Sequence, residues 1–127
     1  MTAQIIDGTA MAADIKSEVA VRVATLKARG VSPGLAVILV GDDPGSVSYV
    51  SGKAKDCDEV GIFSETFHLP AETTQQELLS LVARLNGDNR FHAILPQLPL
   101  PRHVDELAII DSLRPEKDAD GLHPVNL

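Results

Sequence analysis

Three polar residues at helical spacing are the first feature of this chain that could do chemistry. Ser46, Tyr49 and Lys53 are three and four residues apart, so a helix places their side chains on one face. A hydroxyl, an aromatic ring and an amine that point the same way could form a reaction surface. Lys53 would then be the proton-transfer group, provided that its amine is turned toward a cleft.

Each residue of this stripe, which consists of Ser46, Tyr49 and Lys53, also has an ordinary structural interpretation. Ser46 could cap its helix, Tyr49 could mark the boundary of an amphipathic helix, and Lys53 could be solvated. Cys57 extends the stripe by four residues, where we expect a buried and inert thiol. Lys55 is two residues from Lys53 and is expected to point to water.

Further polar side chains fall in segments that are typical of strand ends or loops, where α/β proteins build their sites. Gln97 lies in the proline-rich run 96–101, and its amide either satisfies loop backbone groups or faces a ligand. Asp118 and Asp120 flank Ala119 ahead of a glycine, so each is also an ordinary candidate for a turn former.

The composition narrows the class of protein. The 127 residues are enough for one domain with a real core, and a net charge of −7 argues against a nucleic-acid-binding surface. The single Cys57 cannot form an intramolecular disulfide, which fits a cytoplasmic protein. We expect no membrane partner, because no apolar stretch approaches the roughly 20 residues of a membrane span. Residues 1–7 show no signal-peptide pattern.

Neither a metal site nor a nucleotide site is expected in this chain. The four histidines, at positions 68, 92, 103 and 123, show no ligand spacing with Cys57. The GDDPGS segment at 41–46 lacks both the lysine of a P-loop and the glycine pattern of a dinucleotide site.

The hydrophobic pattern predicts alternating strands and helices. We expect a first helix that begins near residues 7–9 and ends at Gly30, further helices at about 46–60, 74–86 and 103–113, and strands at 35–40, 62–69 and 91–95. This order predicts an α/β fold, a three-layer α/β/α domain with three or four strands in a mostly parallel sheet. Ligands bind such sheets at the carboxyl ends of the strands.

The motifs together resemble a known family. The chain is similar, from end to end, to the N-terminal catalytic domain of the bifunctional methylenetetrahydrofolate dehydrogenase/methenyltetrahydrofolate cyclohydrolases, the FolD family. The matching segments are IIDG at 5–8, PGLAVILVG at 33–41, S-x-x-Y-V-x-x-K-x-K at 46–55, EVGI at 59–62, QLPLP at 97–101 and KDADGLHPVN at 117–126.

The resemblance implies a folate substrate and two reactions. An NADP-dependent dehydrogenase oxidises 5,10-methylenetetrahydrofolate to 5,10-methenyltetrahydrofolate, and a cyclohydrolase adds water to give 10-formyltetrahydrofolate. In this family the lysine that matches Lys53 transfers protons in the hydrolytic step, and the glutamine that matches Gln97 hydrogen-bonds and tunes it. The amidinium cation of the methenyl compound repels a protonated lysine, which favours the neutral amine.

The resemblance also assigns the substrate-binding residues. It places Tyr49 and Asp120 with Lys53 and Gln97 among the catalytic residues. It also implies that Tyr49 stacks on the folate and that Asp120 accepts hydrogen bonds from the amino group and ring nitrogen of the pterin. Ser46 and the backbone near Pro99 and Leu100 are expected to line the same cleft.

The chain departs from the family in length and at one position of the proline-rich motif. The family continues into an NADP-binding Rossmann domain, which we expect beyond residue 127. These 127 residues alone are therefore expected to hold no NADP site, and we expect a homodimer only of the full-length enzyme. Pro96 replaces a small aliphatic residue and removes an N–H just before Gln97.

Two other classes of protein share this architecture. One is the substrate domain of an amino-acid or shikimate dehydrogenase-like enzyme, which has no need of the QLPLP segment. The other is a non-catalytic α/β binding domain. The effect of replacing Lys53 on methenyltetrahydrofolate hydrolysis discriminates among these alternatives.

Overall fold

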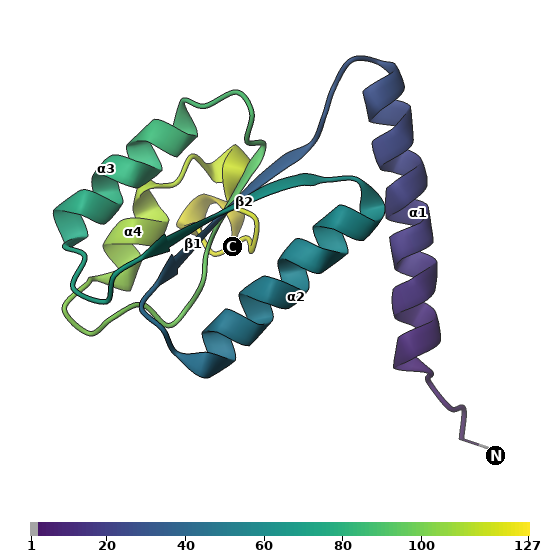
Figure 1. Ribbon diagram of the computed structural model, residues 1–127, viewed down its shortest axis with the longest axis horizontal. Helices are drawn as coiled ribbons and strands as arrows, with labels where there is room; N and C mark the ends of the chain where they lie inside the picture. The colour runs from purple at the N-terminus through teal and green to yellow at the C-terminus, as the bar shows by residue number, and fades with distance from the viewer. Residues whose placement is uncertain (1–2) are drawn as a thin grey trace.

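The computed structural model describes residues 3–127, and its helices and strands alternate along the chain (Figure 1). The elements are α1 (Gly8–Ala28), β1 (Gly34–Val40), α2 (Pro44–Val60), β2 (Phe63–Leu69), α3 (Gln75–Asn86), β3 (Ala93–Pro96), α4 (Glu106–Ser112) and two 3-10 turns, Pro115–Lys117 and Pro124–Asn126. Residues 114–127 contain both short turns.

The three strands form one parallel sheet in the order β2-β1-β3. Gly34 of β1 is level with Phe63 of β2, and Leu35 is level with Ala93 of β3. β1 is therefore the central strand, and the predicted parallel α/β sheet is confirmed with three strands. Helices cover both faces of this sheet (Figure 1).

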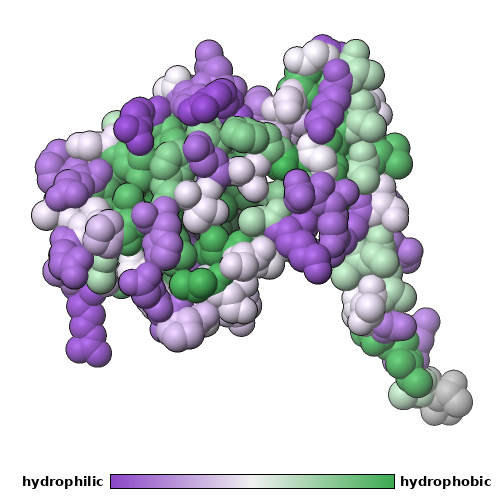
Figure 2. All heavy atoms as spheres, viewed as in Figure 1, coloured by the Kyte–Doolittle hydropathy of each residue, from purple (hydrophilic) through white to green (hydrophobic). Residues whose placement is uncertain are grey.

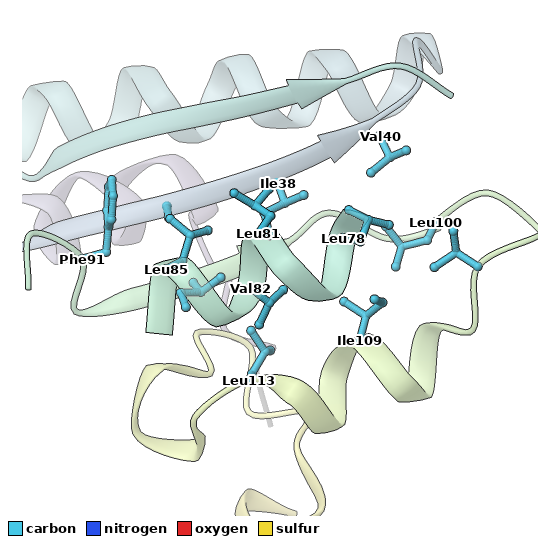
Figure 3. Close-up of a cluster of buried hydrophobic side chains, with 13 residues drawn as sticks. Ile38, Val40, Leu78, Leu81, Val82, Leu85, Phe91, Leu100, Ile109 and Leu113 are labelled. Atoms are coloured by element: carbon cyan, nitrogen blue, oxygen red, sulfur yellow. The ribbon is translucent and has the colours of Figure 1, made fainter. Parts of the chain in front are cut away.

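The side chains of β1 alternate between two cores, which explains why its sequence is apolar throughout. Ala36, Ile38 and Val40 pack into a cluster with side chains of α3 and α4 (Figure 3). Val37 and Leu39 face the opposite way and pack with Val50 of α2. The three-layer arrangement follows from this alternation, because each face of the strand requires its own helical cover.

The long helix α1 lies against α2 rather than against the sheet. Val23 is its only buried residue within the described chain, whereas the apolar residues Met11 and Ile15 are 52% and 56% exposed. Lys16 forms ion pairs with Asp56 and Glu59 of α2, at 2.8 and 3.0 Å. Apolar side chains of α1 consequently reach the surface, as the green atoms along this helix in Figure 2 show.

The predicted elements are confirmed, but several of their bounds were wrong. β3 covers Ala93–Pro96 instead of 91–95, because Phe91 belongs to the turn before the strand and is buried in the core. α4 begins at Glu106 instead of residue 103, since the carboxylate of Asp105 caps it by accepting from the N–H groups of Leu107 and Ala108.

Within residues 3–127, no helix is both long enough and apolar enough to cross a membrane.

Candidate active site

The side chains of Lys53 and Gln97 meet in the structure although 44 residues separate them. The Nζ of Lys53 donates a hydrogen bond of 2.8 Å to the Oε1 of Gln97, and both side chains are half-buried. Lys53 comes from α2, whereas Gln97 follows the last residue of β3. The hydrogen bond thus turns the amine toward the carboxyl end of β3.

Pro96 does not disturb Gln97. The backbone N–H of Gln97 donates to the carbonyl of Ile38 in β1 at 2.8 Å, so the glutamine is tied to the central strand. Successive residues of a strand direct their backbone groups to opposite sides. The nitrogen of Pro96 therefore faces away from β1, on the side where this end strand needs no N–H for the ladder.

The loop after Gln97 offers backbone rather than side chains. The side-chain nitrogen Nε2 of Gln97 donates to the carbonyl oxygen of Leu98 over a distance of 3.4 Å. Pro99 is exposed, while the side chain of Leu100 is buried in the main core. Any ligand at this loop would thus contact the exposed ring of Pro99 and main-chain groups.

Ser46 does not cap α2, and this alternative was wrong. The helix begins at Pro44, and the carboxylate of Asp43 caps it by accepting from the N–H of Ser46 at 2.9 Å. The signal was present in the sequence, because Asp followed by Pro is the pattern of an N-cap and a first helical residue. Ser46 is buried in the first turn of the helix, one turn before Tyr49.

The other side chains of α2 that the sequence singles out differ in how far they are exposed to solvent. Tyr49 is 69% exposed, so its ring is available for stacking on a ligand. Lys55 is exposed, as predicted. Cys57 is buried, and burial is the main reason that the pKa of its thiol is raised.

The two aspartates that flank Ala119 differ in their surroundings. Burial opposes ionisation of Asp118, but hydrogen bonds from the His123 N–H and the Asn126 amide lower its pKa below the ordinary value. Asp118 is therefore a structural residue of the turn. The carboxylate of Asp120 is exposed and accepts no hydrogen bond from the described residues, so it is available to a ligand. No ion pair joins Asp120 to Lys53 within residues 3–127.

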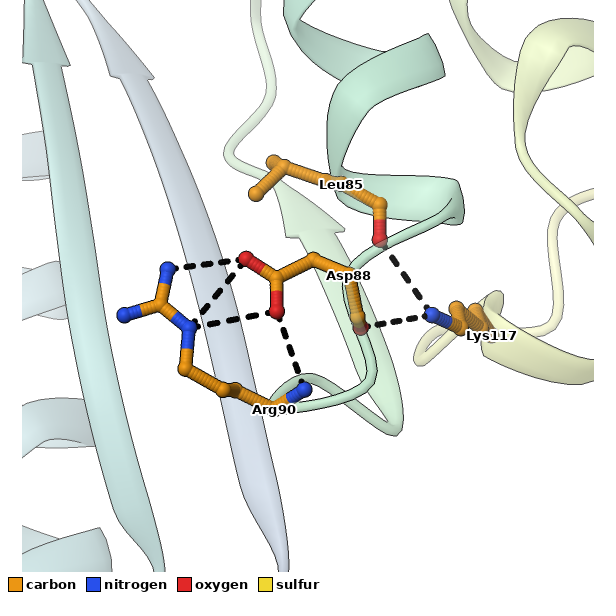
Figure 4. Close-up of polar contacts among 4 residues, drawn as sticks. All are labelled: Leu85, Asp88, Arg90 and Lys117. Carbon is orange, nitrogen blue, oxygen red and sulfur yellow. Dashed lines mark hydrogen bonds and ion pairs between the residues drawn. The ribbon is translucent and has the colours of Figure 1, made fainter.

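The segment that carries Asp120 is fastened at its base to α3 and β3. Lys117 donates to the carbonyl oxygens of Leu85 and Asp88 at 3.2 and 3.1 Å, beside the carboxyl end of α3 (Figure 4). A cation is favourable at that end of a helix dipole. The N–H of Ala119 then donates to the carbonyl of Ile94 in β3 at 3.3 Å. The turn that presents Asp120 therefore starts from the edge of the strand that leads to Gln97.

The start of α2 does not fit the pyrophosphate of a dinucleotide. The carboxylate of Asp43 already accepts a hydrogen bond from the N–H of Ser46. Asp42 adds a second carboxylate, which lies 3.1 Å from the ring nitrogen Nε2 of His68. Phosphate binding at a helix N-terminus requires free N–H groups and favourable charge. The described residues likewise contain no group of three or more histidine, cysteine and acidic side chains that could hold a metal ion.

Comparison with known sequences identifies relatives over almost the whole chain. Bifunctional protein FolD of Anaeromyxobacter dehalogenans is 60% identical over 123 residues, which are 97% of this chain and 44% of that protein. Bifunctional protein FolD of Geobacillus thermodenitrificans is 56% identical over 127 residues, covering all of this chain and 45% of the relative. The chain thus spans less than half the length of these curated relatives.

Solved structures show the same fold. The bifunctional enzyme FolD of Campylobacter jejuni superposes with a TM-score of 0.93 at 49% identity, over 94% of this chain and 43% of that one. The FolD enzyme of Trypanosoma brucei, solved with NADP cofactor and an inhibitor, gives a TM-score of 0.92 at 42% identity, over 98% and 43%. Residues 6–120 match the family described as tetrahydrofolate dehydrogenase/cyclohydrolase, catalytic domain, and the chain belongs to this family.

Proposed function

We propose that this chain is the catalytic domain of an enzyme that interconverts one-carbon derivatives of tetrahydrofolate. The enzyme oxidises 5,10-methylenetetrahydrofolate to the methenyl compound with NADP and hydrolyses that product to 10-formyltetrahydrofolate. The observation that carries the proposal is the 2.8 Å hydrogen bond between Lys53 and Gln97, in a chain that belongs to this family. It places an amine and an amide together where α/β sheets bind ligands.

Lys53 is the acid/base residue of the hydrolytic step. Its neutral amine takes a proton from water as the water oxygen bonds to the amidinium carbon of the substrate. The bond from that carbon to N5 then breaks and N5 receives the proton from the lysine. Loss of the hydroxyl proton to solvent leaves the formyl group on N10. Gln97 aims the amine, because its amide oxygen accepts a hydrogen bond from either form of the lysine.

The pterin and its linker are held by residues around this pair. Asp120 accepts hydrogen bonds from the amino group and ring nitrogen of the pterin, as an exposed acceptor-only carboxylate can. Tyr49 stacks on the folate with its exposed ring. Ser46 and the backbone near Pro99 and Leu100 complete the lining of the site.

The nicotinamide cofactor belongs to a second domain. NADP supplies the hydride acceptor when it is bound, and the two carboxylates at the start of α2 make this chain a poor host for it. We therefore assign residues 1–127 to the catalytic domain and place an NADP-binding Rossmann domain beyond residue 127. The full-length enzyme is proposed to be a cytoplasmic homodimer that acts on small molecules and binds neither nucleic acid nor membrane.

Replacing Lys53 by glutamine in the full-length enzyme tests this proposal. Lys53→Gln removes the amine, and we expect methenyltetrahydrofolate hydrolysis to fall by about 100-fold or more, the usual contribution of a positioned acid/base group. The matched control is Lys55→Gln, which removes the same charge from an exposed position two residues away. Hydrolysis that survives unchanged in Lys53→Gln would overturn the catalytic assignment. Failure of the wild-type enzyme to bind any folate would overturn the substrate.

A further inference from the structure

A carboxylate outside the proposed site fixes the loop that carries Gln97. The N–H of Leu100 donates a 2.7 Å hydrogen bond to the Oε2 of Glu106, at the start of α4. This contact is partly buried, and hydrogen bonds to an ionised acceptor are stronger than neutral ones. Glu106 is six residues from Leu100 and was not singled out by its sequence context.

The loop has few other means of attachment through its backbone. Residues 96–101 contain three prolines, so only Gln97, Leu98 and Leu100 carry a backbone N–H. Gln97 uses its own to reach Ile38 of β1, and Leu100 uses its own to reach Glu106. The N–H groups on either side of the stretch 98–99 thus bond one to the central strand and one to α4, in addition to the packing of the Leu98 and Leu100 side chains on the main core.

We infer that Glu106 is a positioning residue for folate binding, acting through the backbone of residues 98–100. This inference rests on the proposed function, in which that backbone lines the site. The backbone of Gln97 is tied separately to Ile38, and its side chain touches the lining segment only through a 3.4 Å bond to the Leu98 carbonyl. Loss of Glu106 should therefore loosen the lining segment more than the Lys53–Gln97 pair. The expected consequence is a higher KM for folate with kcat retained.

Asp105 provides a matched control for this inference. It is the neighbouring acid and caps the same helix through the N–H groups of Leu107 and Ala108, yet among the described residues its carboxylate accepts no hydrogen bond from the loop at 96–101. Asp105→Ala and Glu106→Ala therefore remove the same charge from the same turn of α4. Only the second removes the acceptor of the Leu100 N–H, whereas Glu106→Gln keeps an oxygen at that position.

The experiment measures steady-state hydrolysis of methenyltetrahydrofolate by the full-length variants, together with hydrogen exchange in the peptide that spans residues 96–101. We expect Glu106→Ala to raise KM by about tenfold with kcat within about twofold of wild type, the loss of one charge-assisted hydrogen bond. Asp105→Ala should leave KM unchanged, and Glu106→Gln should lie close to wild type. Exchange at the Leu100 amide should be accelerated in Glu106→Ala alone.

Equal KM values in the two alanine variants, or a fall in kcat with KM unchanged, would overturn the inference. Leu100 exchange that is as slow in Glu106→Ala as in wild type would do so as well. A wild-type enzyme that does not hydrolyse the methenyl compound would instead overturn the proposed function. In that case the exchange measurement still decides whether Glu106 anchors the loop.

Discussion

The amine of Lys53 is hydrogen-bonded to a neutral acceptor, the amide oxygen of Gln97, at 2.8 Å. This pairing orients the amine without adding a negative charge beside it. A carboxylate in the same place would favour the protonated lysine, which cannot take a proton from water. A neutral acceptor therefore suits the acid/base role proposed for Lys53.

Replacing Gln97 by glutamate tests this argument. Gln97→Glu retains the shape of the side chain but places a negative charge beside the amine that must accept a proton, so hydrolysis should slow by about tenfold or more. Gln97→Ala serves as the comparison, because it removes the hydrogen bond without adding charge. A hydrolysis rate of Gln97→Glu equal to the wild-type rate would contradict the role given to the neutral amide.

Asp118 and Asp120 should separate into a stabilising and a binding residue. Asp118→Ala removes the acceptor of the His123 N–H and the Asn126 amide, so we expect a loss of about 1 kcal/mol in the free energy of unfolding. Asp120→Asn should leave stability unchanged and raise the KM for folate by about tenfold. Chemical denaturation and steady-state kinetics on both variants provide the measurement, and the reverse pattern would refute the assignment.

The ring of Tyr49 should matter more than its hydroxyl. Tyr49→Phe keeps the stacking surface and is expected to bind folate nearly as well as wild type. Tyr49→Ala removes that surface and should weaken binding by about tenfold, from the buried ring area and its stacking. Because the side chain is 69% exposed, neither change should lower the melting temperature much. Fluorescence or calorimetric titration with a folate measures the difference, and equal affinities would exclude stacking.

Asp88 makes stability depend on pH at the acid end. Hydrogen bonds from the Arg90 guanidinium, then from its backbone N–H, lower the pKa of Asp88 from 3.8 to about 2 (Figure 4). The unfolded chain therefore binds this proton at a higher pH than the folded chain. Asp88 contributes stability that is fully present above pH 3.8 and is lost as the pH falls toward about 2.

Melting curves between pH 6 and about 2 test this dependence. Asp88→Asn should melt below wild type at the upper end of that range, and the difference should shrink toward the lower end. Arg90→Leu removes the guanidinium donors but keeps the backbone N–H, so it should show the same pH dependence to a smaller extent. A difference in melting temperature that stays constant across the range would show that Asp88 does not contribute through its ionisation.

The positions of the strands and most helices follow from local sequence. The side chains of β1 are apolar throughout, so both faces of this strand must be covered by other elements. Because strands alternate with helical segments along the chain, the sequence predicts a parallel α/β sheet. The spacing of Ser46, Tyr49 and Lys53 likewise places them on α2 without reference to any distant residue. The ends of the helices were predicted less accurately, since Asp43 rather than Ser46 caps α2.

Sequence by itself thus determined the class of fold, the identity of the motif residues and the helix that bears the amine, because these depend on neighbours a few positions apart. Only the tertiary structure decided that Lys53 reaches Gln97 and that the N–H of Leu100 donates to Glu106. It also decided that the carboxylate of Asp118 accepts hydrogen bonds within its own turn, whereas Asp120 is exposed. Such contacts depend on strand order and on which surfaces the whole chain buries together. Those are properties of the packed core, and no short window of residues contains them.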